Sequence, residues 1–177
     1  MSAKQKTILR TVRIRKDLDE LLQKDAKAKK TSVNGLIAAV MTKYSEWDRF
    51  ADKFGYVSLP KNLLRDLLDA TDDETLLKLA GKFGAEHPNE VIHFWFKRIN
   101  LETLLGYIRI HSEYCNLGQV EIESDDRGYT IRIHHDYGKK WTEFLERFFD
   151  NMWRTYLNAT PHFETGENTV ALRFQLP

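Results

Sequence analysis

The chain has 177 residues, of which 42% are apolar and 30% are charged, proportions typical of a globular protein with one or two domains. The sequence contains no run of about 18 apolar residues, so it predicts no transmembrane helix. Residues 1–7 lack the apolar core of a secretory signal. The single cysteine, Cys115, excludes an internal disulfide, so we expect a cytoplasmic protein without membrane association.

Positive charge is concentrated at the start of the chain. Residues 1–50 contain 12 Lys and Arg against 6 Asp and Glu, whereas the remaining residues contain 15 against 20. The first part therefore carries a net charge of +6 and the second part −5. Such an excess favours binding to phosphate groups. The alternative is that Lys24, Lys27, Lys29 and Lys30 form an ordinary solvated helix face.

The pattern of residues 9–47 predicts one strand followed by two helices. The segment from Leu9 to Arg15 has the period of two that is typical of a strand, in which Val12 and Ile14 would face a helical core and Thr11 and Arg13 would face outward. Apolar residues then recur at helical spacing from Asp17, and Thr31 or Ser32 is placed to cap a second helix. Because a single short strand needs a partner, we expect two copies of the chain to pair their strands.

The segments TVRIRKDL and SVNGLIAAVMTKY resemble the ribbon-helix-helix family of DNA-binding proteins, which includes the Arc and methionine repressors. The resemblance covers about a quarter of the chain. It implies an intertwined homodimer whose β-ribbon enters the DNA major groove. By resemblance, the base-facing positions are Leu9, Thr11 and Arg13. The positions implied to hold phosphates at the start of the second helix are Thr31, Ser32, Val33 and Asn34.

Further phosphate contacts are expected from cations beside the ribbon. These are Lys6, Arg10, Arg15 and Lys16. The first domain is placed at residues 1–50 and is expected to bind DNA and to dimerise.

Residues 51–115 read as a helical connector. The segments YVSLPKNLLRDLL and IRIHHDYGKKWTEFLERFF also resemble uncharacterised archaeal proteins that join a ribbon-helix-helix to a C-terminal α+β domain. Within the connector, Gly84 predicts the end of one helix and Pro88 the start of the next. Asn100 is expected to cap a further helix, and Thr71 to open a capping box.

Residues 116–177 predict a ββαββ domain, in which a helix lies across an antiparallel sheet. Turns are expected at 124–128 and 165–168, with strands on either side. Lys139 to Leu157 is the most strongly amphipathic segment, with an aromatic stripe that fits a core or a ligand pocket. The expected fold class is therefore α+β, with a ribbon-helix-helix, a helical connector and a C-terminal ββαββ unit.

Other candidate sites are less specific. His111 and Cys115 have the i, i+4 spacing of a metal site, as in a metal-sensing regulator, but their spacing and the element order differ from the nickel-responsive repressors. The start of the helix at Gly138, Lys139 and Lys140 has groups that suit an anion, or is simply a capped helix. No catalytic or cofactor motif occurs, so we expect neither an enzyme nor a bound cofactor.

The favoured hypothesis is a dimeric, sequence-specific transcriptional regulator with double-stranded DNA as its partner. In the alternative, the N-terminal domain only dimerises, with higher oligomers also open, and the C-terminal domain binds a partner protein in the manner of an antitoxin. A third hypothesis assigns an effector of unidentified chemistry to the C-terminal domain.

Overall fold

The computed structural model describes residues 8–126 and 128–175, which divide into two units between Arg49 and Phe50. In the first unit, α1 (Lys16–Ala28) and α2 (Val33–Lys43) are followed by a π-helical turn, η1 (Tyr44–Asp48). The short helix α3 (Arg49–Ala51) crosses the division. The expected second helix is thus present, capped by Ser32, whose side chain accepts from the Gly35 N–H at 3.0 Å.

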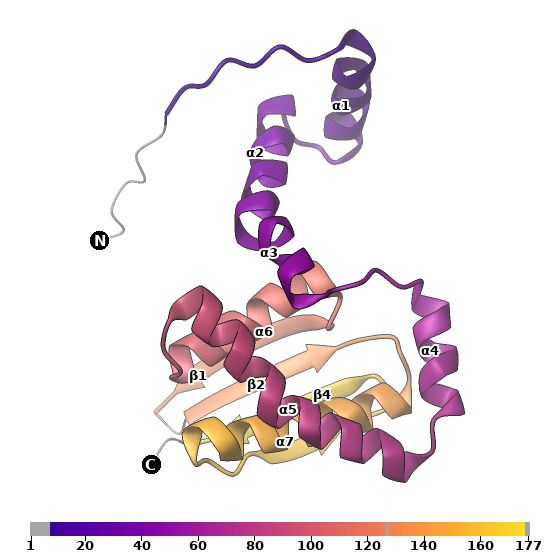
Figure 1. Ribbon diagram of the computed structural model, residues 1–177, viewed down its shortest axis with the longest axis vertical. Coiled ribbons are helices and arrows are strands. Elements are labelled where there is room, and N and C mark those ends of the chain that lie inside the picture. Colours follow the sequence, from indigo (N-terminus) through magenta and orange to yellow (C-terminus); the bar gives the residue numbers. More distant parts are fainter. Residues whose placement is uncertain (1–7, 127, 176–177) are drawn as a thin grey trace. The chain divides into compact units, whose positions relative to one another are not determined.

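The N-terminal β-ribbon is absent from the described residues, so the predictions of a ribbon-helix-helix and of its fold class are wrong. Residues 8–15 form no strand and precede α1 as an irregular segment, drawn in Figure 1 as an extended tail. Val12 and Ile14, the expected core side of the ribbon, are 63% and 40% exposed. Alternation describes only the local chain, whereas a strand also needs a partner for its backbone N–H and C=O groups.

The second unit begins with η2 (Asp52–Phe54) and α4 (Lys61–Ala70), continues with α5 (Asp73–Phe96) and α6 (Leu101–Cys115), and ends in the predicted ββαββ order. The strands are β1 (Gln119–Asp125), β2 (Gly128–His134), β3 (His162–Thr165) and β4 (Thr169–Phe174). Helix α7 (Lys139–Leu157) lies between the two hairpins and has the bounds that the amphipathic pattern predicts.

The four strands form one antiparallel sheet in the order β1-β2-β4-β3. Register pairs Ile131 with Leu172 and Ile133 with Val170, and these four side chains are fully buried. Glu121, Arg132 and other alternate residues face the opposite, exposed side. Since strand side chains alternate between faces, the helices cover one face of the sheet and leave the other open.

The core forms between the sheet and the helices. α7 packs on β3 and β4, α6 packs on β1, and Figure 1 shows α5 and α7 side by side. The aromatic stripe of α7 is core and not pocket: Phe149 and Trp153 are fully buried, and Phe148 is 5% exposed. This burial of large apolar side chains supplies the main driving force for folding the second unit.

The helix break that the sequence predicts at residues 84–88 does not occur in α5. This helix runs through Gly84 and Pro88 without interruption. An added Cβ at Gly84 would overlap the backbone carbonyl of Phe148 on α7. Gly84 is therefore required for the close approach of two helices and does not end α5, and the packing against α7 overrides the local helix-breaking tendency.

Helix caps largely follow the sequence. Asn100 caps α6, as predicted, and it does so in a capping box with Thr103, with both hydrogen bonds at 3.0 Å. At the start of α5 the cap is Asp72 and not Thr71, since Asp72 accepts from the Thr75 N–H at 2.9 Å. Thr71 instead closes α4 by donating its hydroxyl to the Leu67 carbonyl at 2.8 Å. Among the described residues, no helix is both long and apolar enough to cross a membrane.

Candidate nucleic-acid interface

The turn between α1 and α2 places several cations next to a helix start. The Thr31 N–H bonds to the Ala26 carbonyl at 2.9 Å, and the Lys30 N–H bonds to the Lys27 carbonyl at 3.2 Å. These two bonds form a Schellman motif. Lys30 adopts φ 51°, a left-handed conformation in which glycine is the usual residue. The motif reverses the chain within a few residues.

The start of α2 is exposed at three of the four positions expected to hold phosphates. Thr31, Ser32 and Asn34 are exposed, and Val33 is half-buried. An added Cβ at Gly35 would lie 2.7 Å from the Thr31 hydroxyl oxygen, so glycine allows the Thr31 side chain to lie over the first turn. The first backbone N–H groups of a helix have no partner within the helix and carry partial positive charge.

The other predicted contact residues lie in or next to the irregular segment. Leu9, Thr11 and Arg13 are exposed and do not lie on a strand. The described residues therefore contain no ribbon that would present these side chains to DNA bases, and their base-reading roles stay predictions. Arg10 is exposed, and its guanidinium donates to the Leu9 carbonyl at 3.5 Å. Lys6 lies outside the described residues.

Two of the predicted phosphate-binding cations are paired within the chain. Arg15 lies 2.9 Å from the Asp17 carboxylate, and Lys16 lies 3.7 Å from Glu20. All four side chains are highly exposed, so these ion pairs are weak. A DNA phosphate can therefore replace the carboxylate as the partner of each cation. In the described part of the first unit, the exposed cations without a carboxylate within 4.0 Å are Arg10, Arg13, Lys24, Lys27, Lys29 and Lys30.

Apolar side chains of the same unit are also exposed. Within residues 8–49, the buried apolar residues are Ala26 and Trp47. The exposed apolar residues of this unit include Ile8, Leu9, Val12, Ile14, Leu18, Leu21, Val40, Met41 and Tyr44. A unit of this size rarely folds without a metal, a disulfide or a partner to cover such residues.

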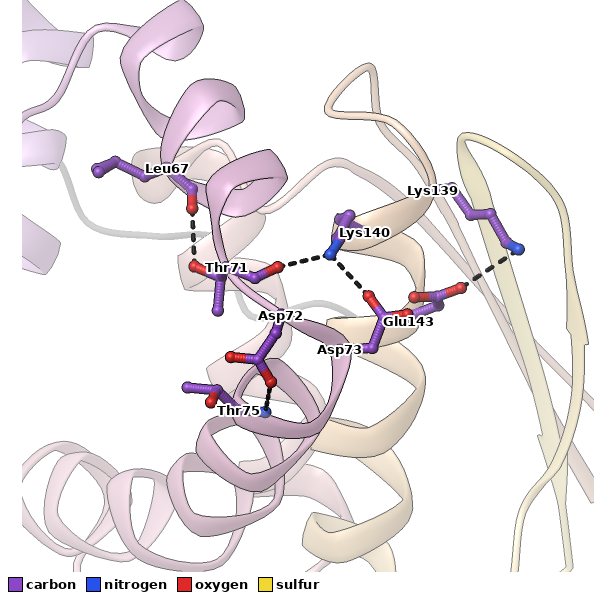
Figure 2. A network of polar contacts seen from close by, with 8 residues as sticks. All are labelled: Leu67, Thr71, Asp72, Asp73, Thr75, Lys139, Lys140 and Glu143. Carbon is purple, nitrogen blue, oxygen red and sulfur yellow. Dashed lines mark hydrogen bonds and ion pairs between the residues drawn. The ribbon is translucent and has the colours of Figure 1, made fainter.

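The structure shows what surrounds the weaker metal and anion candidates. No group of three or more metal-ligating side chains occurs within residues 8–126 and 128–175. His111 is buried on α6, and burial raises the pKa of the Cys115 thiol to about 12, which disfavours the thiolate that a metal needs. At the start of α7, Lys140 contacts Thr71 and Asp73, and Lys139 lies 3.4 Å from Glu143 (Figure 2). The Gly138 N–H donates to the Asn168 side chain at 2.9 Å.

A polar cluster in the second unit has no counterpart among the sequence motifs. The Tyr56 hydroxyl lies 2.7 Å from Nε2 of His87 and 2.7 Å from Nε2 of His111. These contacts span 31 and 55 residues of sequence, so no local spacing reveals them.

No family model matches the chain, and no curated protein matches its sequence.

Proposed function

We propose that the first unit binds double-stranded DNA as a homodimer and that the chain acts as a non-enzymatic transcriptional regulator. The observation that carries the proposal is the set of exposed cations between Arg10 and Lys30 without carboxylate partners in the described residues. Lysines and arginines that neutralise DNA phosphates release condensed counterions, which drives binding without reading sequence. This role would place the protein in the cytoplasm, where it has access to DNA.

Homodimer formation is supported by the apolar side chains of the first unit. Leu18, Leu21, Val40 and Met41 are 39–61% exposed, and only a partner surface would remove them from water. Two copies would also double the number of cations presented to one duplex. Sedimentation velocity on the full chain should therefore show a dimer at micromolar concentration, and replacing Leu21 and Met41 with Ser should shift the population toward monomer.

DNA binding is tested by the fluorescence anisotropy of a labelled duplex of random sequence. If the dimer neutralises roughly 6–10 phosphates, its affinity should fall about 10³–10⁵-fold between 50 and 200 mM salt. Replacing Lys27, Lys29 and Lys30 with Gln should weaken binding and flatten the salt dependence, by a slope of about 0.9 for each phosphate that the variant no longer neutralises.

The matched control removes three exposed cations from the second unit by replacing Arg65, Lys78 and Lys82 with Gln. This control changes the net charge by the same amount, so it separates a local interface from a general charge effect. Equal loss of affinity in the two triple variants would contradict the proposed interface, and no affinity at low salt would contradict DNA binding itself.

The second candidate function is a protein-interaction module. It is favoured by a different observation, the exposed apolar residues at and before α4, of which Leu59, Leu63 and Leu67 follow each other at four-residue steps. These side chains are 43–52% exposed. Under this alternative the first unit dimerises, the chain shows no DNA affinity at any salt concentration, and a partner protein binds the second unit.

A further inference from the structure

A chain of hydrogen bonds links three distant segments of the second unit. Tyr56 follows Gly55, which adopts φ 68°, and precedes the irregular segment that leads to α4. The Tyr56 hydroxyl contacts His87 on α5 and His111 on α6. One side chain therefore joins the 55–60 segment to two helices of the core.

The direction of each hydrogen bond follows from one fixed acceptor. Nδ1 of His111 lies 2.8 Å from the Tyr107 carbonyl oxygen, which can only accept, so Nδ1 carries the proton. In a neutral imidazole Nε2 is then an acceptor, and the Tyr56 hydroxyl donates to it. The Tyr56 oxygen accepts in turn from Nε2–H of His87. With neutral rings, this is the arrangement that satisfies all three contacts.

The surroundings keep both rings neutral at pH 7. Burial lowers the pKa of His111 to about 4, and the His111 ring lies against the Tyr107 ring, with ring centroids 4.0 Å apart and the planes tilted by 35°. Burial also lowers the pKa of His87, against the opposing effect of Glu90 on the same helix. The ring of Phe83, 4.3 Å away, stacks on His87.

The tyrosine and cysteine side chains around the cluster stay neutral in acid. Burial raises the pKa of Tyr56, of Tyr107 and of Cys115 on α6, and of Tyr156 on α7. Glu90 favours the charged form of His87, so it does not stabilise the neutral rings on which the hydrogen bonds of the cluster depend. The two histidines are therefore the groups whose protonation changes the hydrogen bonds at Tyr56.

We propose that the Tyr56, His87 and His111 cluster is an acid-sensitive latch that holds residues 55–60 on the core at neutral pH and releases them when both histidines are protonated. A first proton can be accommodated on Nδ1 of His87, because Nε2–H of His87 still donates to Tyr56 and the Tyr56 hydroxyl still donates to His111. A second proton makes both Nε2 atoms donors. The Tyr56 hydroxyl can then donate to neither ring, and two cations face each other with ring centroids 6.0 Å apart.

The pH window follows from the direction of the two shifts. A histidine whose pKa is lower in the folded state than its usual value of about 6.5 binds fewer protons when folded than when unfolded. The stability that the latch contributes is complete above about pH 6.5 and is lost as the pH falls toward the pKa of His111, about 4. Release therefore belongs to the mildly acidic range.

Hydrogen exchange on the full chain tests the latch. Rates corrected for intrinsic exchange should show that residues 52–62 lose about tenfold or more of their protection between about pH 7.5 and about pH 4.5, while the β2–β4 core keeps its protection. Tyr56→Phe, which keeps the ring and removes the hydroxyl, should already show low protection at neutral pH and little further change in acid. Tyr129→Phe serves as the matched control and should behave as the wild type.

A second measurement reads the protons directly and does not depend on any variant. Long-range ¹H–¹⁵N spectra of histidine-labelled protein should show His111 protonated at Nδ1 and His87 at Nε2 at neutral pH, with His93→Gln used to remove an exposed signal. The proposal is overturned if His111 carries its proton on Nε2, or titrates at or above its usual value. It is also overturned if Tyr56→Phe and the wild type have the same pH profile of protection.

Discussion

Lys140 connects the start of α7 to the start of α5 through Asp73. Its ammonium lies 2.7 Å from the Asp73 carboxylate and donates to the Thr71 carbonyl at 2.6 Å (Figure 2). We expect Lys140→Met to lower the melting temperature of the second unit by about 2–4 °C, because the Thr71 carbonyl and Asp73 lose a shared donor. The control is Lys139→Met, since Lys139 pairs with Glu143 on its own exposed helix turn, and it should leave the melting temperature nearly unchanged.

Gly84 and Gly81 face α7 from the same helix but should respond differently to an added methyl group. Gly84→Ala places its Cβ against the Phe148 backbone, which cannot move without separating the helices, so we expect a loss of about 1–3 kcal/mol. Gly81→Ala meets the Asn151 side-chain amide at 2.8 Å, which can turn away by giving up its 2.9 Å hydrogen bond to the Gly81 carbonyl. The higher helix propensity of alanine, roughly 0.5–1 kcal/mol, should then keep Gly81→Ala near neutral in urea unfolding. A larger loss at residue 81 would contradict this packing.

Thr142 joins two loops of the sheet end through a buried hydroxyl. Its oxygen accepts from Nε2–H of His135 at 3.0 Å, and its proton goes to the Glu167 carbonyl at 2.9 Å. Thr142→Val keeps the shape but leaves both partners unsatisfied, for which we expect about 1–3 kcal/mol of destabilisation by chemical denaturation. Thr142→Ser retains the hydroxyl and should lose less; equal losses would indicate that the methyl group, and not the hydrogen bonds, matters.

Lys30 is expected to be a site where glycine improves the first unit. Because an L-residue in the left-handed conformation costs about 1–2 kcal/mol, Lys30→Gly should raise the thermal stability of α1 and α2. Lys29→Gly, one residue earlier at φ −85°, removes the same charge and should lower stability instead. Circular dichroism at one fixed protein concentration compares them, since the stability of the proposed dimer would depend on concentration. Opposite signs for the two variants are the expected result.

The sequence by itself determined the elements whose signals are local. Helix α7 repeats its apolar residues at helical spacing along its whole length, and its bounds, Lys139–Leu157, match the prediction. The Asn100 cap and the two hairpins of the C-terminal sheet are likewise set by neighbours a few residues apart. Such patterns need no information from distant parts of the chain.

Only the tertiary structure decided the features that depend on a partner. The alternation of residues 9–15 suits a strand, but no strand lies beside it in the described residues, and the segment is irregular. Gly84 and Pro88 are helix breakers by themselves, yet α5 continues through them because it packs against α7. Tyr56, His87 and His111 meet across the fold, since a hydrogen bond requires proximity in space and places no condition on separation in sequence.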